Sequence, residues 1–132
     1  MEITICPGKA PRWAAVPLSK SEGHRALILA AVAQGETLLP RLPASGDLLA
    51  TMDCLRQMGA LFTERKNGLL VTPISGLPSA PLRLDCRESG STLRFLLPVA
   101  AALGLRAVFT GRGRLPQRPV EALLAALRRN GI

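Results

Sequence analysis

The sequence is poor in aromatic side chains. Its 132 residues include three Phe, one Trp and no Tyr. Modules that bind nucleic-acid bases stack them on aromatic rings, so this composition argues against that class. The core has to be aliphatic, and a hydrophobic content of 48% favours a globular fold over a disordered chain.

Cysteine and histidine are also scarce. Cys6, Cys54 and Cys86 are far apart and in no metal-binding spacing, and there is one His. These counts argue against a disulfide framework and against a zinc site, so we expect free thiols in a reducing compartment such as the cytoplasm. No apolar run is long enough to span a membrane. The start, MEITICPGKAPRWAAV, lacks the apolar stretch of a signal peptide.

Positive charge is in excess and is concentrated in the second half. The formal net charge is +8, and residues 81–132 contain nine Arg against three acidic residues. Such a balance favours anionic partners: nucleic acid, an anionic membrane, or small molecules with phosphate and carboxylate groups. No run of basic residues resembles a tail, so the charge belongs to the folded part.

The stretch SKSEGHRALILAAVAQG predicts the first helix. We expect it to run from about Glu22 to Gln34, with Ser21 as its N-terminal cap and Gly35 as its stop. The helix is apolar nearly all round, which predicts that it is buried.

Further elements follow directly. A second helix is expected over residues 48–58, with Asp47 as cap and dipole partner and Gly59 as its end. Asn67-Gly68 lies between two short β-prone runs and predicts a hairpin. A short strand near Thr37–Leu39 is expected to link the two helices.

The second half of the chain repeats the pattern of the first. SKSEGHRALILAAVA matches ESGSTLRFLLPVAAA, which places Arg25 on Arg94, and DLLATMDCLRQMGA matches PVEALLAALRRNGI. We expect one repeat at about 15–75 and a second at about 80–132 that ends where its hairpin should begin. The chain is therefore expected to be a fragment of a longer protein; the alternative is a compact two-repeat domain without the last hairpin.

Prolines mark the structure of the second copy. Pro98 falls inside its first helix, where it removes a hydrogen bond and predicts a kink. Pro116 and Pro119 bracket GRLPQRP, which predicts a loop, and Pro119 suits the first turn of the next helix. Arg118 would then lie just ahead of that helix.

Both copies place polar residues at a helix N-terminus, where free N–H groups and the helix dipole bind anions. The candidate anion-binding residues are Lys20, Ser21 and Arg25 in the first copy and Gly90, Ser91, Thr92 and Arg94 in the second, with Arg118 ahead of its second helix. Either end alone could be an ordinary capped helix, but the duplication predicts two such ends side by side. His24 is interpreted as a local hydrogen-bonding or surface residue rather than a base. The chain has no nucleophile–base pair, Walker loop or dinucleotide fingerprint.

Four linked motifs resemble one enzyme family. PLSKSEGHRALILAAVAQGET, SGDLLATMDCLRQMGA, ESGSTLRFLLPVAAALG and FTGRGRLPQRPVEALLAALRRNGI are similar, in order and spacing, to 5-enolpyruvylshikimate-3-phosphate synthases. The resemblance implies an α/β (α+β) fold of βαβαββ-type repeats, part of the inside-out α/β barrel of the enolpyruvyl transferases. It also implies that this is the N-terminal segment and that the remainder of the enzyme lies beyond Ile132.

The implied activity is that of a 3-phosphoshikimate 1-carboxyvinyltransferase of aromatic amino-acid biosynthesis, in which an enolpyruvyl group passes from phosphoenolpyruvate to shikimate 3-phosphate. No metal or organic cofactor is implied. Lys20 would be catalytic and contact both substrates. The other residues that the resemblance implies are Ser21 and Arg25 for shikimate 3-phosphate, Gly90 and Arg118 for phosphoenolpyruvate, and Arg94 as a weaker match.

Three residues depart from the family pattern. Leu18 occupies a position where the family usually has Gly, Glu88 one where it has Asn, and Ser91 one where it has Thr. A carboxylate beside a bound anion is unfavourable unless Glu88 points away or pairs with an arginine such as Arg87. The alternatives left open are transfer to another acceptor such as UDP-N-acetylglucosamine, and a non-catalytic module of this repeat fold that binds anions or nucleic acid.

Overall fold

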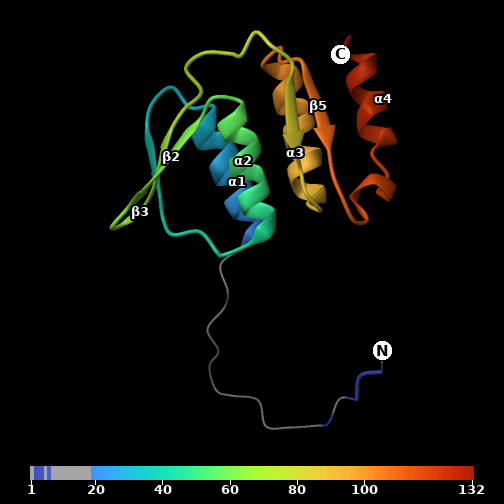
Figure 1. The fold of residues 1–132 in the computed structure, drawn as a ribbon, viewed down its shortest axis with the longest axis horizontal. Coiled ribbons are helices and arrows are strands. Elements are labelled where there is room, and N and C mark those ends of the chain that lie inside the picture. The colour runs from blue at the N-terminus through green and yellow to red at the C-terminus, as the bar shows by residue number, and fades with distance from the viewer. Residues whose placement is uncertain (1, 5, 7–18) are drawn as a thin grey trace.

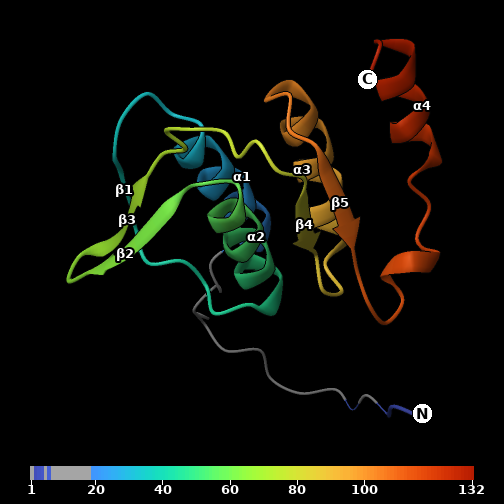
Figure 2. The ribbon, with the colours of Figure 1, turned by 45° about the horizontal axis from the view of Figure 1, so that its top comes forward.

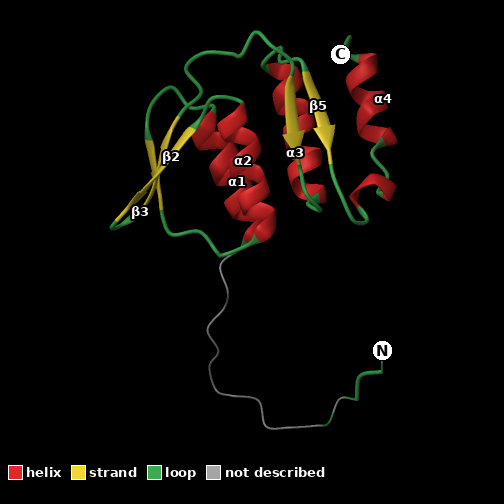
Figure 3. Cartoon of the chain, in the orientation of Figure 1, coloured by secondary structure: helices red, strands yellow, loops and turns green. Residues whose placement is uncertain are grey.

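The structure is a computed structural model that describes residues 2–4, 6 and 19–132. In that part of the chain, helices and strands alternate along most of the sequence (Figures 1 and 3). The elements in chain order are α1 (Lys20–Ala31), β1 (Thr37–Leu39), α2 (Gly46–Gln57), β2 (Leu61–Arg65), β3 (Gly68–Thr72), β4 (Leu82–Asp85), α3 (Gly90–Ala102), β5 (Ala107–Thr110), a 3₁₀ turn (Leu115–Gln117) and α4 (Glu121–Arg129).

The elements form layers. Strands β1, β3 and β2 make an antiparallel sheet in that order, and helices α1 and α2 pack against it. Helix α3 lies beside α1 and α2 and connects β4 to β5, which pair in parallel (Figures 1 and 2). Helix α4 stands at the far end, beyond β5. The mixed α/β class predicted from the sequence is confirmed.

An aliphatic core fills the space between the three central helices and their strands. Its largest fully buried apolar side chains are Leu27, Leu55, Met58, Val71, Leu84 and Leu96. All three cysteines are free thiols, as predicted. Cys54 and Cys86 are buried in this core, and a hydrogen bond between them, together with burial, raises the pKa of the Cys54 thiol far above its usual range.

Helix α1 begins two residues earlier than predicted. Ser19 is its cap: the backbone of Ser19 is extended, and its Oγ accepts a hydrogen bond of 3.3 Å from the Glu22 N–H. The prediction that Ser21 is the cap is therefore wrong, because the capping hydroxyl has to lie ahead of the first turn. Lys20 and Ser21 form that first turn instead, where no intrahelical carbonyl is available for their N–H groups.

The prediction that α1 is buried all round is also wrong. Leu27, Ala30 and Ala31 face the core, whereas Leu29 is 67% exposed and Val32 is 43% exposed. Helix α1 packs on α2, α3 and the three-stranded sheet, and together these cover only one side of it. An apolar pattern shows that a surface can be buried, but not that a neighbour is present to bury it.

The predictions for the rest of the first half hold with small shifts. Helix α2 starts at Gly46, so Asp47 lies in its first turn rather than at the cap, and Gly59 follows its end with a φ of +111°. The predicted hairpin is confirmed as β2 and β3, and β1 covers Thr37–Leu39 as predicted.

The second half holds two corrections. Helix α3 continues through Pro98, so the predicted place of this proline inside the helix is confirmed, while the kink stays a prediction. The segment predicted to be loop contains the 3₁₀ turn at residues 115–117, which tolerates Pro116 because the first N–H groups of a helix need no intrahelical acceptor. Pro119 precedes α4 by two residues rather than lying in its first turn.

The uneven burial of α1 leads to a stability prediction. Leu27→Ala should lower the free energy of unfolding by about 2–5 kcal/mol, because it leaves a cavity in the core. Leu29→Ala is the matched control on the same helix and should change this free energy by less than about 0.5 kcal/mol. Urea denaturation followed by circular dichroism measures both. Equal losses in the two variants would contradict the packing described for α1.

Candidate functional site at the helix N-termini

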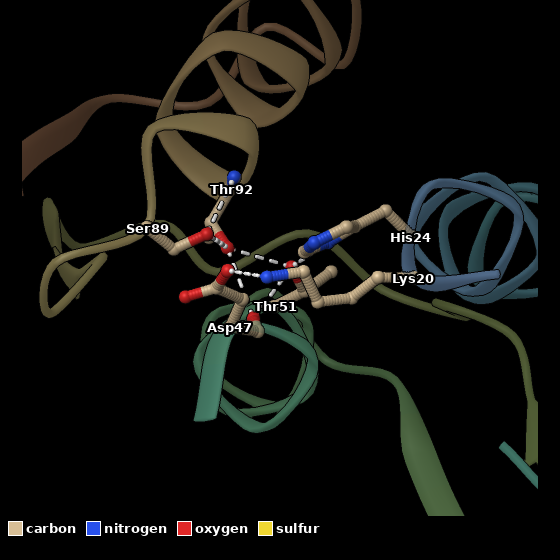
Figure 4. A network of polar contacts seen from close by, with 6 residues as sticks. All are labelled: Lys20, His24, Asp47, Thr51, Ser89 and Thr92. Carbon is tan, nitrogen blue, oxygen red and sulfur yellow. Dashed lines mark hydrogen bonds and ion pairs between the residues drawn. The ribbon is translucent and has the colours of Figure 1, made fainter. Parts of the chain in front are cut away.

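Three helices begin at the same end of the molecule. In Figure 1 the first turns of α1, α2 and α3 all lie at the lower end of the view, and Figure 4 shows their side chains converging. Each first turn presents N–H groups with no intrahelical acceptor, together with the positive end of a helix dipole. The arrangement favours anions over cations before any side-chain charge is added.

Lys20 and Asp47 join α1 to α2 at this end. The Nζ of Lys20 lies 2.8 Å from Oδ2 of Asp47. Both side chains are partly exposed to solvent, so the ion pair contributes about 1 kcal/mol at most. A weak, exposed ion pair of this kind keeps the Lys20 side chain near the N-terminus of α1 and still allows it to turn toward an anion.

Arg25 lies one turn further along α1. Its Nη1 donates to the carbonyl of Ser21 at 3.3 Å, and its guanidinium carbon lies 5.6 Å from the centre of the Phe95 ring of α3. The two contacts hold an exposed cation between two helices, with the aromatic face supporting the charge. Lys20, Ser21 and Arg25 thus occupy one end of α1, as predicted.

Gly90, Arg94 and Arg118 make a second cluster at the start of α3. A methyl group added at Gly90 would lie 2.7 Å from Nη1 of Arg118 and 3.6 Å from Nη1 of Arg94. The Nη2 of Arg94 also donates to the carbonyl of Pro119 at 3.2 Å, which ties α3 to the segment that carries Arg118. Two guanidinium groups therefore lie against the bare backbone of Gly90, and among the described residues neither has an acidic partner.

The two clusters touch through intermediaries rather than directly. The Asp47 carboxylate binds Lys20, while the Asp47 carbonyl accepts from Oγ1 of Thr92 at 3.2 Å. Phe95 of α3 supports Arg25 of α1. The six predicted residues thus fall into two neighbouring groups on adjacent helices, with residues of α2 and α3 between them.

A buried polar chain that sequence reasoning did not find lies beneath these clusters. It joins His24 of α1, Thr51 of α2 and Thr92 of α3, and ends at Ser89, which caps α3 (Figure 4). His24 does make a hydrogen bond, but its partner Thr51 lies on another helix, so the interpretation as a local hydrogen-bonding residue is wrong. The alternative that it lies on the surface is also wrong, because only 1% of the residue is exposed. Its partners lie on other helices, so no local sequence signal points to them.

Burial lowers the pKa of His24 below its ordinary value. The nearby carboxylate of Asp47 opposes the shift, and the ammonium of Lys20 reinforces it. Removal of the imidazole from water dominates, so the ring is neutral at physiological pH.

The loop before α3 is held by acidic groups. Arg87 has a φ of +52°, and its N–H donates to Oδ1 of Asp85 at 2.8 Å. Its guanidinium pairs with Asp53 at 2.6 Å, so the suggested pairing with Glu88 is wrong. The Glu88 carboxylate instead lies against Gly113, where an added methyl group would meet it at 2.6 Å. The departure at Leu18 lies outside the described residues.

One hollow of the described structure lies away from these clusters. A hollow of about 500 Å³ lies between the loop before α2 and the turn of the β2–β3 hairpin, and none of the six predicted residues lines it. In the described residues, the charged side chains of the candidate site, Lys20, Arg25, Arg94 and Arg118, are exposed. No group of metal-binding side chains occurs among the described residues. In the same part of the chain, every helix is too short or too polar to cross a membrane.

Comparison with known proteins identifies the family. The family model for EPSP synthase (3-phosphoshikimate 1-carboxyvinyltransferase) matches residues 14–132. The chain belongs to the EPSP synthase family. The recognition made from the four motifs is therefore confirmed, and the match extends over both halves of the chain.

Individual EPSP synthases agree with this assignment. The chain is 36% identical to the 3-phosphoshikimate 1-carboxyvinyltransferase of Clostridium perfringens over 121 residues, which is 91% of this chain and 28% of that protein. It is 38% identical to the enzyme of Clostridium kluyveri over 119 residues, again 28% of that protein. The structure of EPSP synthase from Acinetobacter baumannii superposes with a TM-score of 0.73 at 31% identity, and covers 89% of this chain and 28% of the other. The chain thus spans somewhat more than a quarter of the length of these EPSP synthases.

The close approach at Gly90 predicts an effect on anion binding. Gly90→Ala should weaken binding of inorganic phosphate, because the new methyl group displaces the guanidinium of Arg118. Gly46→Ala is the matched control, since Gly46 also opens a helix and an added methyl group there meets nothing within 4 Å. NMR titration of both variants measures the affinity. Equal affinities would show that the cluster at α3 does not bind phosphate.

The buried imidazole predicts a pH dependence of stability. The folded protein holds His24 with a pKa below about 6.5, so below that pH the unfolded chain binds more protons than the folded one. The free energy of unfolding should therefore fall as the pH is lowered from about 7.5 to about 5.5. The fall should be smaller in His24→Asn, and His24 is the only histidine of the chain. Identical pH profiles from urea denaturation of the two proteins would contradict the assignment.

Proposed function

We propose that the chain forms one wall of the active site of a 3-phosphoshikimate 1-carboxyvinyltransferase, with shikimate 3-phosphate bound near α1 and phosphoenolpyruvate near α3. The observation that supports this most directly is the contact of Arg94 and Arg118 with Gly90 at the start of α3, in a member of the EPSP synthase family. Two arginines at a helix end without a side chain in the way suit a small ligand with several anionic groups.

The end of α1 suits a phosphate ester. A phosphate there would meet the free N–H groups of the first turn, the hydroxyl of Ser21 and the guanidinium of Arg25. In the structure this guanidinium donates to the Ser21 carbonyl and rests on Phe95, which keeps it within the same turn. We assign Ser21 and Arg25 to shikimate 3-phosphate.

The end of α3 suits a ligand with both a phosphate and a carboxylate. Gly90 lets the ligand reach the backbone, and Arg118 can hold a carboxylate or phosphate through two parallel hydrogen bonds. Arg94 supports the segment of Arg118 through the Pro119 carbonyl and adds a second positive charge. We assign Gly90 and Arg118 to phosphoenolpyruvate, with Arg94 in an auxiliary role.

The proposed reaction is an addition followed by an elimination. The 5-hydroxyl of shikimate 3-phosphate loses its proton as its oxygen bonds to C2 of phosphoenolpyruvate, and C3 gains a proton. The bond from C2 to the phosphate oxygen then breaks, C3 loses a proton, and the double bond is restored as phosphate leaves. Lys20 is the first residue of α1, and its side chain reaches Asp47 of α2. It would contact both substrates and offset their negative charges near the reacting atoms.

The whole reaction requires more than this chain. The curated relatives are more than three times as long as the matched segment, and transfer needs groups held on both sides of the substrates. We therefore propose substrate binding, but no turnover, for the 132-residue chain. The same proposal has three further parts. The chain divides into repeats at about 15–75 and 80–132, the remainder of the enzyme lies beyond Ile132, and the enzyme is located in the cytoplasm. The order helix, strand, helix, which occurs from α1 to α2 and again from α3 to α4, supports the repeats.

Titration with shikimate 3-phosphate tests the proposal. The chain should bind it saturably, and Ser21→Ala and Arg25→Ala should each weaken binding, the latter by about tenfold or more because a charged hydrogen bond is lost. Arg128→Ala removes an equal charge from the last turn of α4 and should leave the affinity unchanged. Calorimetry or NMR measures all four proteins.

Other ligands separate the alternatives. If the chain binds UDP-N-acetylglucosamine in preference to shikimate 3-phosphate, the result would favour an enolpyruvyl transferase that acts on another acceptor. Tight, strongly salt-dependent binding of an oligonucleotide, without binding of either small substrate, would favour the nucleic-acid alternative. A folded chain that binds none of these ligands would refute the proposed half-site.

A further inference from the structure

The buried chain beneath the site connects three helices through three side chains. The Nδ1 of His24 lies 2.8 Å from Oγ1 of Thr51, and this oxygen lies 2.8 Å from Oγ1 of Thr92. Oγ1 of Thr92 also lies 2.8 Å from Oγ of Ser89. Because His24, Thr51 and Thr92 come from α1, α2 and α3 in turn, each link joins two helices near the ends where they begin.

The chain is isolated from solvent. His24 is 1% exposed, Thr51 and Thr92 are fully buried, and Ser89 is 2% exposed. Hydrogen bonds between buried groups are strong, and the loss of one leaves its partner without compensation from water. The Nε2 of His24 has no partner in the described structure, so Thr51 is the only group that orients the ring by a hydrogen bond.

The same residues border the groups assigned to the ligands. The Asp47 carbonyl is within hydrogen-bond reach of both threonine hydroxyls, at 3.3 Å from Thr51 and 3.2 Å from Thr92, while the Asp47 carboxylate binds Lys20. Thr92 lies two residues after Gly90 in the first turn of α3. On the other side of the ring, His24 makes an edge contact with Phe95, on which Arg25 rests.

We propose that His24 is a positioning residue: through Thr51 and Thr92 it fixes the relative positions of the N-termini of α1, α2 and α3. It thereby sets the position of the cluster around Lys20 relative to the cluster around Gly90, and so the arrangement of the two anions that they bind. The inference rests on the proposed function for the identity of the ligands, but the positioning itself concerns any anion held at these helix ends. His24 does not touch the ligand in this arrangement, since it is buried beneath the first turns.

A positioning role, unlike a purely structural one, requires that a change at one end of the hydrogen-bonded chain alters the groups at its other end. Each hydroxyl has one hydrogen to donate, and the Asp47 carbonyl competes for those of Thr51 and Thr92, so a proton on Nδ1 of His24 changes which acceptors the two hydroxyls use. A change at Thr92 should therefore alter the imidazole even though Thr92 does not contact it. Binding of an anion at the start of α3 should also alter the imidazole of His24.

The test uses the 132-residue chain, with inorganic phosphate as the probe and the ring ¹⁵N shifts of His24 as the spectroscopic readout. Thr92→Val keeps the shape of the side chain and removes the hydroxyl, Thr92→Ser restores the hydroxyl, and Thr63→Val on the exposed strand β2 is the matched control. Circular dichroism establishes that each variant is folded before it is titrated.

Three results are expected together. Saturation of the unmodified chain with phosphate shifts the His24 ring resonances. Folded Thr92→Val has altered ring resonances and binds phosphate about fivefold more weakly or worse, the range typical of coupled sites. Thr92→Ser and Thr63→Val remain close to the unmodified chain in both respects.

Any one of several results would overturn the proposal. The first is a folded Thr92→Val variant with unchanged phosphate affinity. The second is a set of His24 ring resonances that do not shift at saturating phosphate. The third is a chain that binds no phosphate at millimolar concentration. If Thr92→Val does not fold, the phosphate-induced shift in the unmodified chain decides alone. A chain that passes these tests but does not bind shikimate 3-phosphate would refute the proposed function and leave the positioning role intact.

Discussion

The beginning of an α-helix has N–H groups that its own carbonyls cannot reach, and the candidate site depends on how three such beginnings share one end of the molecule. Ser19 and Ser89 each satisfy one N–H group by capping α1 and α3, and α2 has no side-chain cap. Helices with adjacent positive ends repel one another, so they need something to hold them together. Buried hydrogen bonds among His24, Thr51 and Thr92, backed by the aliphatic core, serve that purpose here.

Charge in the site is arranged in two tiers. The cations proposed to meet a ligand are exposed side chains: Lys20, Arg25, Arg94 and Arg118. Lys20 and Arg94 each make one polar contact, and Arg25 makes two weak ones. Beneath them the polar groups are uncharged: two threonines, a serine and a neutral histidine. Uncharged hydrogen-bonding groups cost far less to bury than ions do. The exposed cations can thus change partners when a ligand arrives, while the buried layer that supports them keeps its geometry.

Local signals in the sequence predicted most of the elements, and long-range contacts account for what was missed. The hairpin at Asn67-Gly68 and the end of α2 at Gly59 depend on neighbouring residues, so they could be predicted. The cap of α1 moved from Ser21 to Ser19 because either serine satisfies the same pattern. The exposure of Leu29 and the pairing of Arg87 with Asp53 depend on which elements meet in space, and no periodicity reveals that. The six predicted site residues did fall at two neighbouring helix ends, because the internal match of the two halves carries long-range information that a single motif lacks.

The segment that carries Arg118 is attached differently from the rest of the site. Helix α4 buries none of its residues completely, and the Arg94 hydrogen bond to the Pro119 carbonyl is one of the few polar links from its N-terminal side to α3. Regions with so little buried surface open locally at a small free-energy cost. An anion that needs Arg118 therefore binds only the fraction of molecules in which this segment is docked, and its apparent affinity is reduced by that fraction. Whatever presses α4 against α3 would tighten binding without touching the ligand, so the affinity of the site is partly a property of how the C-terminal helix is seated.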